Sequence, residues 1–417
     1  MGDRAASGRA GRSGSVRISK VDLFLVEVPL RRSFRSSSST TTSVRHPLVH
    51  LVGLGGEEGW GEAPTPVDPY YVGETPGSAL TVINDYLAPL VVGVDWEHPS
   101  DVARALLRVK GNSLARSAVE MAAWDLWCRA EGLPLALALS GYADLAGGRP
   151  ASKVPTGSLR PAPRVPTGSL RPAPRVPAGA ALGTEDDLGV ILRRVDECVA
   201  AGYRRVKIKI APGCDVQVVG AVRERHPALI VVADANGAYR FDDPAHLAAL
   251  ADLDGLGLMA IEQPLGDDDL VGHARLQEFL ATAVALDEAI TSVHALEAAI
   301  TLGSCRAVSL KAPRLGGLTA ALDLLAVCRE HGIDAWCGGM HELGIGRAAN
   351  LALASQPGFT LPGDMASSDF YFAEDLVSPP LSVEGGEIAV PAGTGLGVEV
   401  DGDRVDASRV GALPHVG

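Results

Sequence analysis

The sequence predicts an α/β protein built as a (β/α)₈ barrel, with a smaller α+β domain in front of the barrel. Three observations lead to this prediction. Strand-like apolar runs alternate with helix-period runs from about residue 176 to residue 364. Several strand-like runs end in a charged residue, and from Lys209 to Lys311 these residues follow one another at steps of 24–28 positions. The chain before residue 146 instead shows hairpin-like strands followed by helical stretches.

The N-terminal part begins with residues 1–17, which are rich in Gly, Ser and Arg and lack the apolar run of a signal peptide. We expect a disordered tail there. Residues 18–146 form the predicted α+β domain, with strands at 21–30, 48–54 and 60–63 and helices at 77–90, 100–110 and 114–130. Gly132 is the expected cap of the last helix. The polar run 31–43, dense in Ser and Thr, is expected to be a mobile loop that covers a site.

The barrel is predicted over residues 176–364. Its eight strands are expected at 176–182, 205–210, 229–235, 258–262, 283–287, 307–311, 334–339 and 359–363. A helix at 185–201 is expected to begin at Thr184 and to stop at Gly202, and another at 318–331 to stop at Gly332. A doubly wound open sheet is the rival architecture, but it would not readily bring five charged strand ends around one centre.

Two segments flank the barrel. Residues 365–417 contain Gly- and Pro-rich strands and are expected to pack back on the first domain. Residues 147–175 contain an identical duplication, because the sequence VPTGSLRPAPR occurs at 154–164 and again at 165–175. We interpret this stretch as a Pro-rich, exposed insertion without a function of its own. A basic docking arm is the alternative interpretation.

Composition narrows the classes of partner. The net charge of −13 argues against nucleic acid and against an anionic membrane surface as partners. No apolar run reaches the length of a transmembrane helix. The six cysteines are scattered and form no CxxC pair, which favours a reducing cytoplasm over a disulfide framework or a zinc site. We therefore expect a cytoplasmic protein that acts on a small molecule.

Three carboxylates end consecutive strands of the predicted barrel: Asp234, Glu262 and Asp287. The carboxyl ends of barrel strands converge on one mouth, so these groups would repel one another unless a cation lay between them. Oxygen ligands favour Mg²⁺, with Mn²⁺ as the alternative, over zinc. Asn236 is expected to support this set from behind. The side chain of Glu288 is expected to face the other way, and it is interpreted as a structural partner or as a further contact.

Lysines occupy two other strand ends. Lys207 and Lys209 lie two residues apart and share a face of the second strand, and Lys311 ends the sixth, on the opposite side of the ring. A partly desolvated lysine near another cation loses its proton more easily and can act as a base near pH 7. The metal would take up charge on a substrate carboxylate. This arrangement suits abstraction of a proton α to a carboxylate, and two opposed bases also permit racemisation.

These residues carry a family resemblance. Lys207-x-Lys209, Asp234-Ala-Asn236, Glu262-Gln-Pro, Asp287-Glu and Lys311 resemble the enolase superfamily, in its muconate-lactonising branch. The resemblance implies a capping α+β domain, a modified TIM barrel and Mg²⁺. It also implies that Lys209 and Lys311 are the acid/base pair and that Lys207 supports Lys209.

Further stretches are similar to the N-succinylamino acid racemase / o-succinylbenzoate synthase group, and the similarity covers about residues 18–400. They are Lys209-Ile-Ala-Pro-Gly-Cys-Asp, Lys311-x-x-Arg314-x-Gly-Gly and Trp336-Cys-Gly-Gly-Met-x-Glu342. Arg314, Glu342 and His341 are therefore expected to contact the substrate or to support the residues that do. His341 stands at a usually apolar position of the group, and it is interpreted either as an added polar contact or as an ordinary loop histidine.

The sequence leaves several activities open. The first is a Mg²⁺-dependent racemase of N-acyl amino acids, especially N-succinyl ones. The second is o-succinylbenzoate synthase, a dehydrating lyase of menaquinone synthesis. A dipeptide epimerase or a cycloisomerase is a third, and a barrel that binds without catalysing belongs to a different class. We expect a small-molecule carboxylate substrate and a homo-oligomeric assembly.

Overall fold

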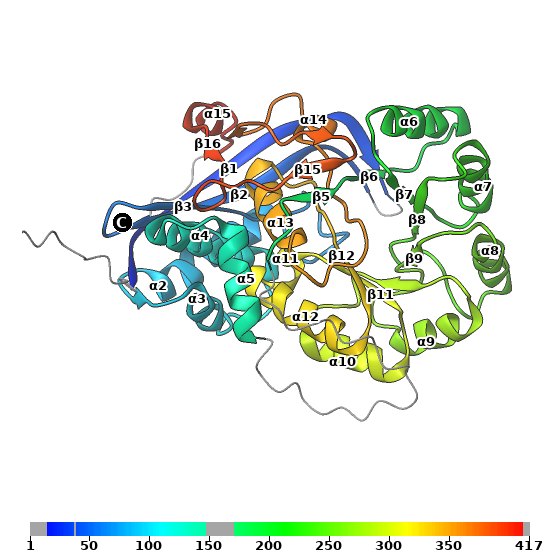
Figure 1. Ribbon diagram of the computed structural model, residues 1–417, viewed down its shortest axis with the longest axis horizontal. Coiled ribbons are helices and arrows are strands. Elements are labelled where there is room, and N and C mark those ends of the chain that lie inside the picture. The colour runs from blue at the N-terminus through cyan, green and yellow to red at the C-terminus, as the bar shows by residue number, and fades with distance from the viewer. Residues whose placement is uncertain (1–14, 37–38, 147–170, 412–417) are drawn as a thin grey trace, which may run out of the picture.

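The computed structural model describes residues 15–36, 39–146 and 171–411. Figure 1 shows a curved sheet with its helices beside a second layer of long strands and helices that comes from both ends of the chain. The expected tail falls almost wholly outside the described residues, as does most of the duplicated insertion. No helix among the described residues is long and apolar enough to cross a membrane.

The capping domain contains a four-stranded antiparallel sheet in the order β3-β2-β1-β4. Its strands are β1 (Val16–Arg35), β2 (Thr40–Gly53), β3 (Glu58–Glu62) and β4 (Asp95–Trp96). Its helices are α1 (Pro76–Val82), η1 (Ile83–Leu87), α2 (Ala88–Val91), α3 (Pro99–Leu106), α4 (Ser113–Glu131) and α5 (Leu135–Ala146). The helix α4 ends at Gly132 with a positive φ, as predicted, while α5 was not predicted.

The prediction of a mobile loop at 31–43 is wrong. The strands β1 and β2 pair as far as Arg35 and Thr40, so most of this polar run is a β-hairpin. Threonine favours strands, and the apolar Phe34 and Val44 are buried, which anchors the hairpin. The hairpin therefore forms a wall beside the barrel.

Close contact between β3 and α4 depends on glycine. A Cβ atom at Gly61 would lie 2.0 Å from the carbonyl oxygen of Ala118 and 2.8 Å from the amide nitrogen of Ala122, both backbone atoms of α4. We expect Gly61→Ala to lower the free energy of unfolding by about 1–3 kcal/mol, because strand and helix must move apart. Denaturant unfolding measures this effect. Gly77→Ala in α1 is the control, since no atom lies within 4 Å of its added Cβ, and an equal loss there would contradict the steric explanation.

The barrel contains a seven-stranded parallel sheet in the order β12-β11-β10-β9-β8-β7-β6. Its strands are β6 (Gly179–Leu182), β7 (Arg205–Lys209), β8 (Ile230–Asp234), β9 (Ala260–Glu262), β10 (Val284–Leu286), β11 (Ala307–Leu310) and β12 (Asp334–Cys337). The helices between and after them are α6 (Leu188–Ala200), α7 (Val216–Arg225), α8 (Pro244–Asp254), α9 (Leu270–Phe279), α10 (Val293–Leu302), α11 (Ala312–Leu315), α12 (Leu318–His331) and α13 (Gly344–Ala354). Asp187, rather than the predicted Thr184, caps the start of α6.

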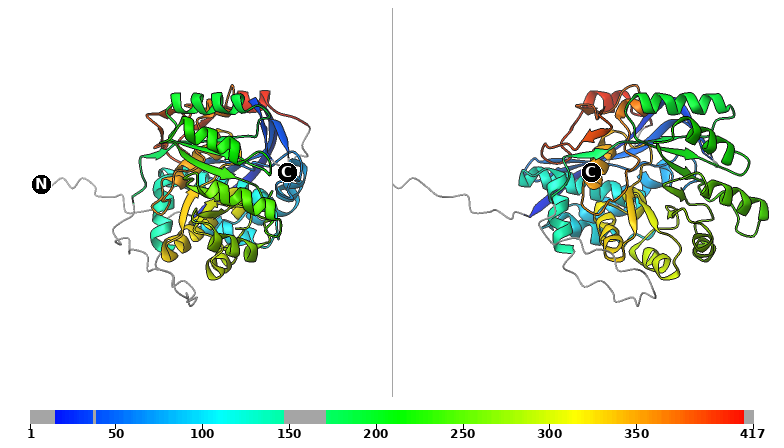
Figure 2. Two further views of the ribbon diagram at one scale, coloured as in Figure 1. Left: turned by 90° about the vertical axis from the view of Figure 1, so that its right-hand side faces the viewer. Right: turned by 45° about the vertical axis from the view of Figure 1, so that its right-hand side comes forward.

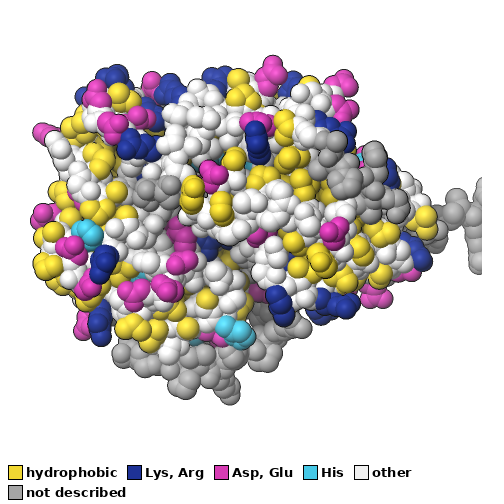
Figure 3. All heavy atoms as spheres, turned by 180° about the vertical axis from the view of Figure 1, so that it is seen from behind, with side chains coloured by type: hydrophobic (Ala, Val, Ile, Leu, Met, Phe, Trp, Pro, Cys, Tyr) yellow, Lys and Arg dark blue, Asp and Glu magenta, His cyan; other side chains and the backbone are white. Residues whose placement is uncertain are grey.

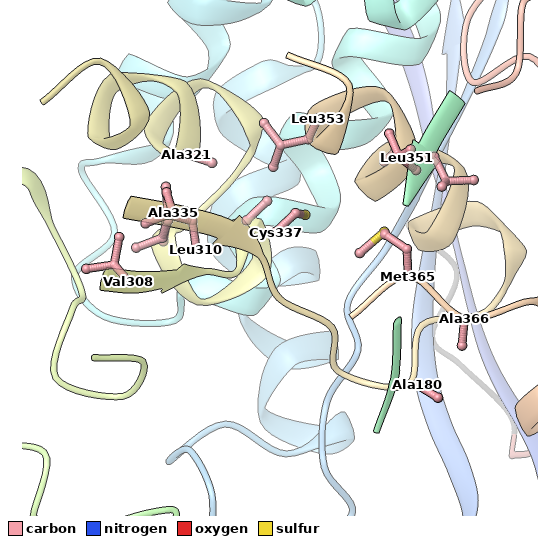
Figure 4. Close-up of a cluster of buried hydrophobic side chains, with 14 of the residues drawn as sticks. Ala180, Val308, Leu310, Ala321, Ala335, Cys337, Leu351, Leu353, Met365 and Ala366 are labelled. Atoms are coloured by element: carbon pink, nitrogen blue, oxygen red, sulfur yellow. The ribbon is translucent and has the colours of Figure 1, made fainter. Parts of the chain in front are cut away.

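The predicted eighth strand at 359–363 is not a regular strand. The chain there still bridges the two edges of the sheet, because the Asp364 amide donates to the Cys337 carbonyl and the Gly179 amide donates to the Met365 carbonyl, both at 3.0 Å. Figure 4 shows Met365 and Ala366 lying between Ala180 and the side chains of α13. The sheet is thus closed by an irregular segment, which is the modified form of the barrel.

The C-terminal segment returns to the capping domain. It carries α14 (Ser368–Tyr371), β13 (Val377–Ser378), β14 (Val383–Glu384), β15 (Glu387–Ala389), β16 (Glu399–Val400) and α15 (Gly402–Ala407). The strand β15 pairs with β5 (Arg175–Pro177), which is split from β6 although one strand was predicted over both. The backbone of Arg409 bridges to Val26 in β1. Figures 1 and 2 show this red segment beside the blue strands.

Charges of both signs are interspersed on the surface. On the face shown in Figure 3, Lys and Arg side chains lie among Asp and Glu side chains rather than in one broad basic area. This pattern fits the acidic net charge of −13. It offers no positive stripe of the kind that follows a nucleic-acid backbone on this face.

Candidate active site

The three predicted carboxylates lie at the same end of the parallel sheet. Asp234 ends β8 and Glu262 ends β9, and the two are register partners. Asp287 follows directly after β10. All three side chains are buried, with exposed fractions of 1% or less. Neighbouring parallel strands end together, which is why residues 25–28 positions apart in the sequence meet here.

Each of these carboxylates is paired with a lysine. The Lys207 ammonium lies 3.1 Å from both Asp234 and Glu262. Lys209 donates to Asp234 at 2.8 Å and Lys311 donates to Asp287 at 2.6 Å. The lysines are themselves buried, so the pairs form a compact network of charge at the mouth of the barrel.

Burial and the neighbouring carboxylates act in opposite directions on the pKa of two of the lysines. Burial alone would lower the pKa of Lys207 and of Lys311. The surrounding carboxylates outweigh burial and raise both pKa values well above the ordinary lysine value. Burial and the charge of Asp234 raise the pKa of the Glu262 carboxyl to about 8, although Lys207 opposes the shift. The carboxylates, rather than the neighbouring ammonium groups, dominate the electrostatics.

The donor chemistry of this cluster fits a divalent cation. It offers carboxylate oxygens from three strand ends, and Oε2 of Glu262 accepts no hydrogen bond although the Lys207 ammonium lies 3.1 Å away. Among the described residues, no group of three or more His, Cys, Asp and Glu side chains is arranged around one point as metal ligands. The lysine ammonium groups compensate part of the negative charge of these carboxylates.

Two of the residues predicted to support the site, Asn236 and Arg314, contact its charged side chains or backbone, whereas Glu342 does not. Asn236 accepts from Lys209, and its amide donates to Glu288 at 2.6 Å, so Glu288 lies against the site rather than facing away from it. Arg314 lies behind Asp287 and donates to its backbone carbonyl at 3.0 Å. Glu342 is buried beside Arg347 at 3.6 Å. It does not line the cavity that Lys207, Lys209 and Lys311 share, which is described below.

His341 lies at the cavity wall between two aromatic rings. Its ring centroid is 4.5 Å from that of Phe34 and 4.9 Å from that of Tyr371. Burial and the charge of Arg347 lower the pKa of His341 to about 3, so the imidazole is neutral at neutral pH. A neutral ring between aromatic rings shapes the pocket more than it carries charge.

Several residues of the site were not predicted. Asp364, on the irregular closing segment, accepts from Lys207 at 2.8 Å and also from Arg205. Gln263 has a positive φ and its side-chain oxygen accepts from the Asp287 amide at 3.0 Å, which fixes that strand end. Asp364 ends the sequence Phe-Thr-Leu-Pro-Gly-Asp at 359–364, but no strand periodicity marks it as facing the site.

Tyr71 of the capping domain also reaches the barrel residues. Its hydroxyl accepts from Lys311 at 2.7 Å and donates to Asp287 at 3.1 Å. We expect Tyr71→Phe to fold normally and to lower kcat/KM about tenfold, because Lys311 loses its hydrogen bond to the Tyr71 hydroxyl. Steady-state kinetics measures the change in kcat/KM. Tyr70→Phe is the control, since Tyr70 is 67% exposed. Equal rates for both variants would contradict the role of the Tyr71 hydroxyl.

One cavity connects the capping domain with this network. Its wall includes side chains of the β1–β2 hairpin, of the barrel mouth and of the segment around His341. Lys207, Lys209 and Lys311 all line it, as does Asn236. A small molecule bound there would contact the lysines at one end and the hairpin at the other.

The fold and this cluster define a class of protein. Residues 20–139 match the mandelate racemase / muconate lactonizing enzyme N-terminal domain, and residues 191–404 match the enolase C-terminal domain-like family. The chain therefore belongs to the enolase superfamily and is an enzyme of that superfamily. Its relatives are lyases and isomerases, and members of the superfamily generally use Mg²⁺.

Individual relatives narrow the group. The chain is 40% identical over 388 residues to the o-succinylbenzoate synthase of Bacillus subtilis, covering 93% of this chain and 95% of the relative. It is 38% identical over 385 residues to the N-succinylamino acid racemase of Thermus thermophilus, covering 92% and 95%. A crystal structure of an enolase-superfamily member from Listeria innocua matches with a TM-score of 0.83 at 34% identity, covering 95% and 98%. The predicted resemblance to this group is confirmed.

Proposed function

We propose that the enzyme removes the proton α to a carboxylate, forms an enediolate and racemises N-acyl amino acids, N-succinyl ones in particular. Lys209 and Lys311 are the two bases. The observation that carries this proposal is that both lysines line one cavity from β7 and from the end of β11, with three strands between them in the sheet. A substrate between them would present opposite faces of its α carbon to the two amines.

The two lysines alternate in role. The neutral amine of one removes the α proton, and the ammonium of the other delivers a proton to the opposite face of the enediolate. Asn236 and Asp234 orient the amine of Lys209, and Tyr71 and Asp287 orient that of Lys311. The reverse direction exchanges the roles, so the same residues serve both enantiomers.

Asp234, Glu262 and Asp287 would hold Mg²⁺, or Mn²⁺. When bound, the cation would stabilise the negative charge that develops on the substrate carboxylate. Lys207 is a positioning residue in this proposal, because its ammonium holds Asp234, Glu262 and Asp364 together.

The lyase is the second candidate. The 40% identity to an o-succinylbenzoate synthase over nearly the whole chain favours it. In that reaction Lys209 removes the α proton and returns it to the hydroxyl on the same face, which departs as water, while Lys311 stabilises the enediolate as a cation. The lyase therefore needs one base where the racemase needs two.

Incubation in D₂O with Mg²⁺ and a panel of N-succinyl L-amino acids tests the proposal. We expect NMR to detect deuterium at the α carbon and chiral chromatography to detect the D enantiomer. A parallel assay follows dehydration to o-succinylbenzoate. Dehydration without α exchange across the panel would overturn the racemase proposal in favour of the lyase.

A further inference from the structure

The side chain of Glu288, which the proposed reaction does not use, lies against Asn236. Glu288 lies two residues past the end of β10, and Asn236 lies two residues past the end of β8. The side-chain nitrogen of Asn236 donates to Oε1 of Glu288 at 2.6 Å. Oε2 of Glu288 has no hydrogen-bond partner among the described residues. Of the two residues only Asn236 lines the cavity, so Glu288 reaches the reacting groups through Asn236.

The partners of the Asn236 amide determine which way it faces. On one side lies the Lys209 ammonium, which only donates, and on the other lies the Glu288 carboxylate, which only accepts. An amide between them bonds with both groups in one orientation, with its oxygen toward Lys209 and its nitrogen toward Glu288. Turned end for end, it would place two oxygens together at Glu288 and N–H donors of both groups together at Lys209.

This orientation matters most when Lys209 is the neutral base. A neutral amine carries two N–H donors and one lone pair. The amide oxygen of Asn236 accepts from an N–H and leaves the lone pair free for the α proton of the substrate. An amide NH₂ group in the same place would donate to that lone pair, and the amine could then not take up the proton.

The backbone around Glu288 is held independently of its side chain. The Arg314 guanidinium donates to the Glu288 carbonyl at 2.9 Å. The side-chain oxygen of Gln263 accepts from the amides of Asp287 at 3.0 Å and Ala289 at 3.2 Å, on either side of Glu288. Replacement of the Glu288 side chain therefore leaves the strand end and Asp287 in place.

We propose that Glu288 is a positioning residue for Lys209. Its carboxyl group keeps the oxygen of the Asn236 amide toward Lys209, so that the lone pair of the Lys209 amine is free to take the α proton. Lys311 donates instead to Tyr71 and Asp287, so loss of the bond between Glu288 and Asn236 impairs one of the two bases and not the other. This inference rests on the proposed function.

Two substitutions separate the hydrogen bond from the charge. Glu288→Ala and Glu288→Gln both remove a negative charge that also acts on Lys311, but only glutamine keeps an oxygen that can accept from Asn236. Each enantiomer of an N-succinyl amino acid is incubated separately in D₂O. NMR and chiral chromatography then give the ratio of deuterated product with inverted configuration to deuterated substrate with retained configuration. The enantiomer that Lys311→Ala still exchanges is the one whose proton faces Lys209.

In Glu288→Ala we expect this ratio to fall about tenfold for the enantiomer whose proton faces Lys311, because delivery of deuterium by Lys209 becomes slow. For the other enantiomer the ratio should rise, because the enediolate is deuterated mainly by Lys311. Glu288→Gln should change either ratio by less than about twofold. Each ratio comes from one sample and does not depend on how much enzyme is correctly folded. Unchanged ratios in Glu288→Ala, or equal shifts in Glu288→Gln, would overturn the proposal.

Two further variants are the controls. Tyr71→Phe removes a hydrogen bond from Lys311, so it should shift both ratios in the opposite directions. Glu278→Ala, at an exposed position of α9, should shift neither ratio. Shifts in Tyr71→Phe that match those of Glu288→Ala would show that the ratios report general damage to the site, and this result would also overturn the proposal.

A neutron crystal structure of the wild-type enzyme in D₂O covers the case in which Glu288→Ala does not fold. We expect both deuterons of the Asn236 amide on the side of Glu288. Deuterons on the side of Lys209 would overturn the proposal. The proposed function fails separately, if the wild-type enzyme exchanges the α proton of neither enantiomer, and the neutron structure then still tests the orientation of Asn236.

Discussion

Replacement of Lys311 by alanine is expected to abolish racemisation, with a loss of at least about 10³-fold in rate, because one face of the enediolate loses its proton donor. Lys209→Ala should have the same effect. In D₂O, each variant should still exchange the α proton of the one enantiomer whose proton faces the remaining lysine. NMR of each enantiomer, incubated separately, measures this.

We expect both variants to fold, because each carboxylate that loses a lysine keeps another cation in the ion-pair network of the site. Without Lys311, Asp287 keeps an ion pair with Arg314 at 3.3 Å. Without Lys209, Asp234 keeps an ion pair with Lys207 at 3.1 Å. Neither Asp287 nor Asp234 is therefore left without a cation in these variants. Lys20→Ala, at a surface pair with Asp22, is the control, and wild-type racemisation in either active-site variant would refute the two-base assignment.

Removal of divalent cations is expected to have a comparably large effect. Treatment with EDTA followed by dialysis should lower activity by about 10³-fold or more, and Mg²⁺ should restore it, because the enediolate would lose its charge stabilisation. Activity that persists through this treatment would remove the metal from the mechanism. Mn²⁺ should restore part of the activity, since it accepts the same oxygen ligands.

The variant Glu262→Gln tests whether Glu262 itself is a metal ligand, independently of Asp234 and Asp287. The amide keeps the shape of the side chain but removes one negative charge, so we expect the apparent affinity for Mg²⁺ to fall at least about tenfold. Titration of the dialysed enzyme with Mg²⁺ measures it. Lys207 retains Asp364 at 2.8 Å in this variant, which keeps the ammonium paired. An unchanged Mg²⁺ titration would show that Glu262 is not a ligand.

Most of the site residues that could be predicted from the sequence lie at the ends of strands. Lys209, Asp234 and Glu262 stand in register because each closes an apolar run, and such runs are visible in a single sequence. The helix α12 was predicted to the residue, since Gly332 stops it. The segment at 359–363 also looked like a strand, but it turns between two edges of the sheet, and this depends on contacts that periodicity does not encode.

The other omissions share a physical cause. Tyr71 and His46 belong to the capping domain and reach the site only through the packing of two domains. Nothing local marks them, because a tyrosine in a loop and a histidine in a strand are ordinary. The Ser/Thr run at 31–43 was judged by its polarity, while its β-branched residues and two buried apolar anchors decide that it forms a hairpin.

The hydrogen bonds between the first strand and the last described residues bear on how the chain matures. The Glu27 amide donates to the Ser408 carbonyl at 2.9 Å, and the Val410 amide donates to the Leu25 carbonyl at 2.8 Å. An edge of β1 is therefore completed by residues that leave the ribosome after the whole barrel. The whole barrel is made between the two halves of this contact, so the pocket wall that β1 carries can acquire its final support only after every barrel strand has been synthesised.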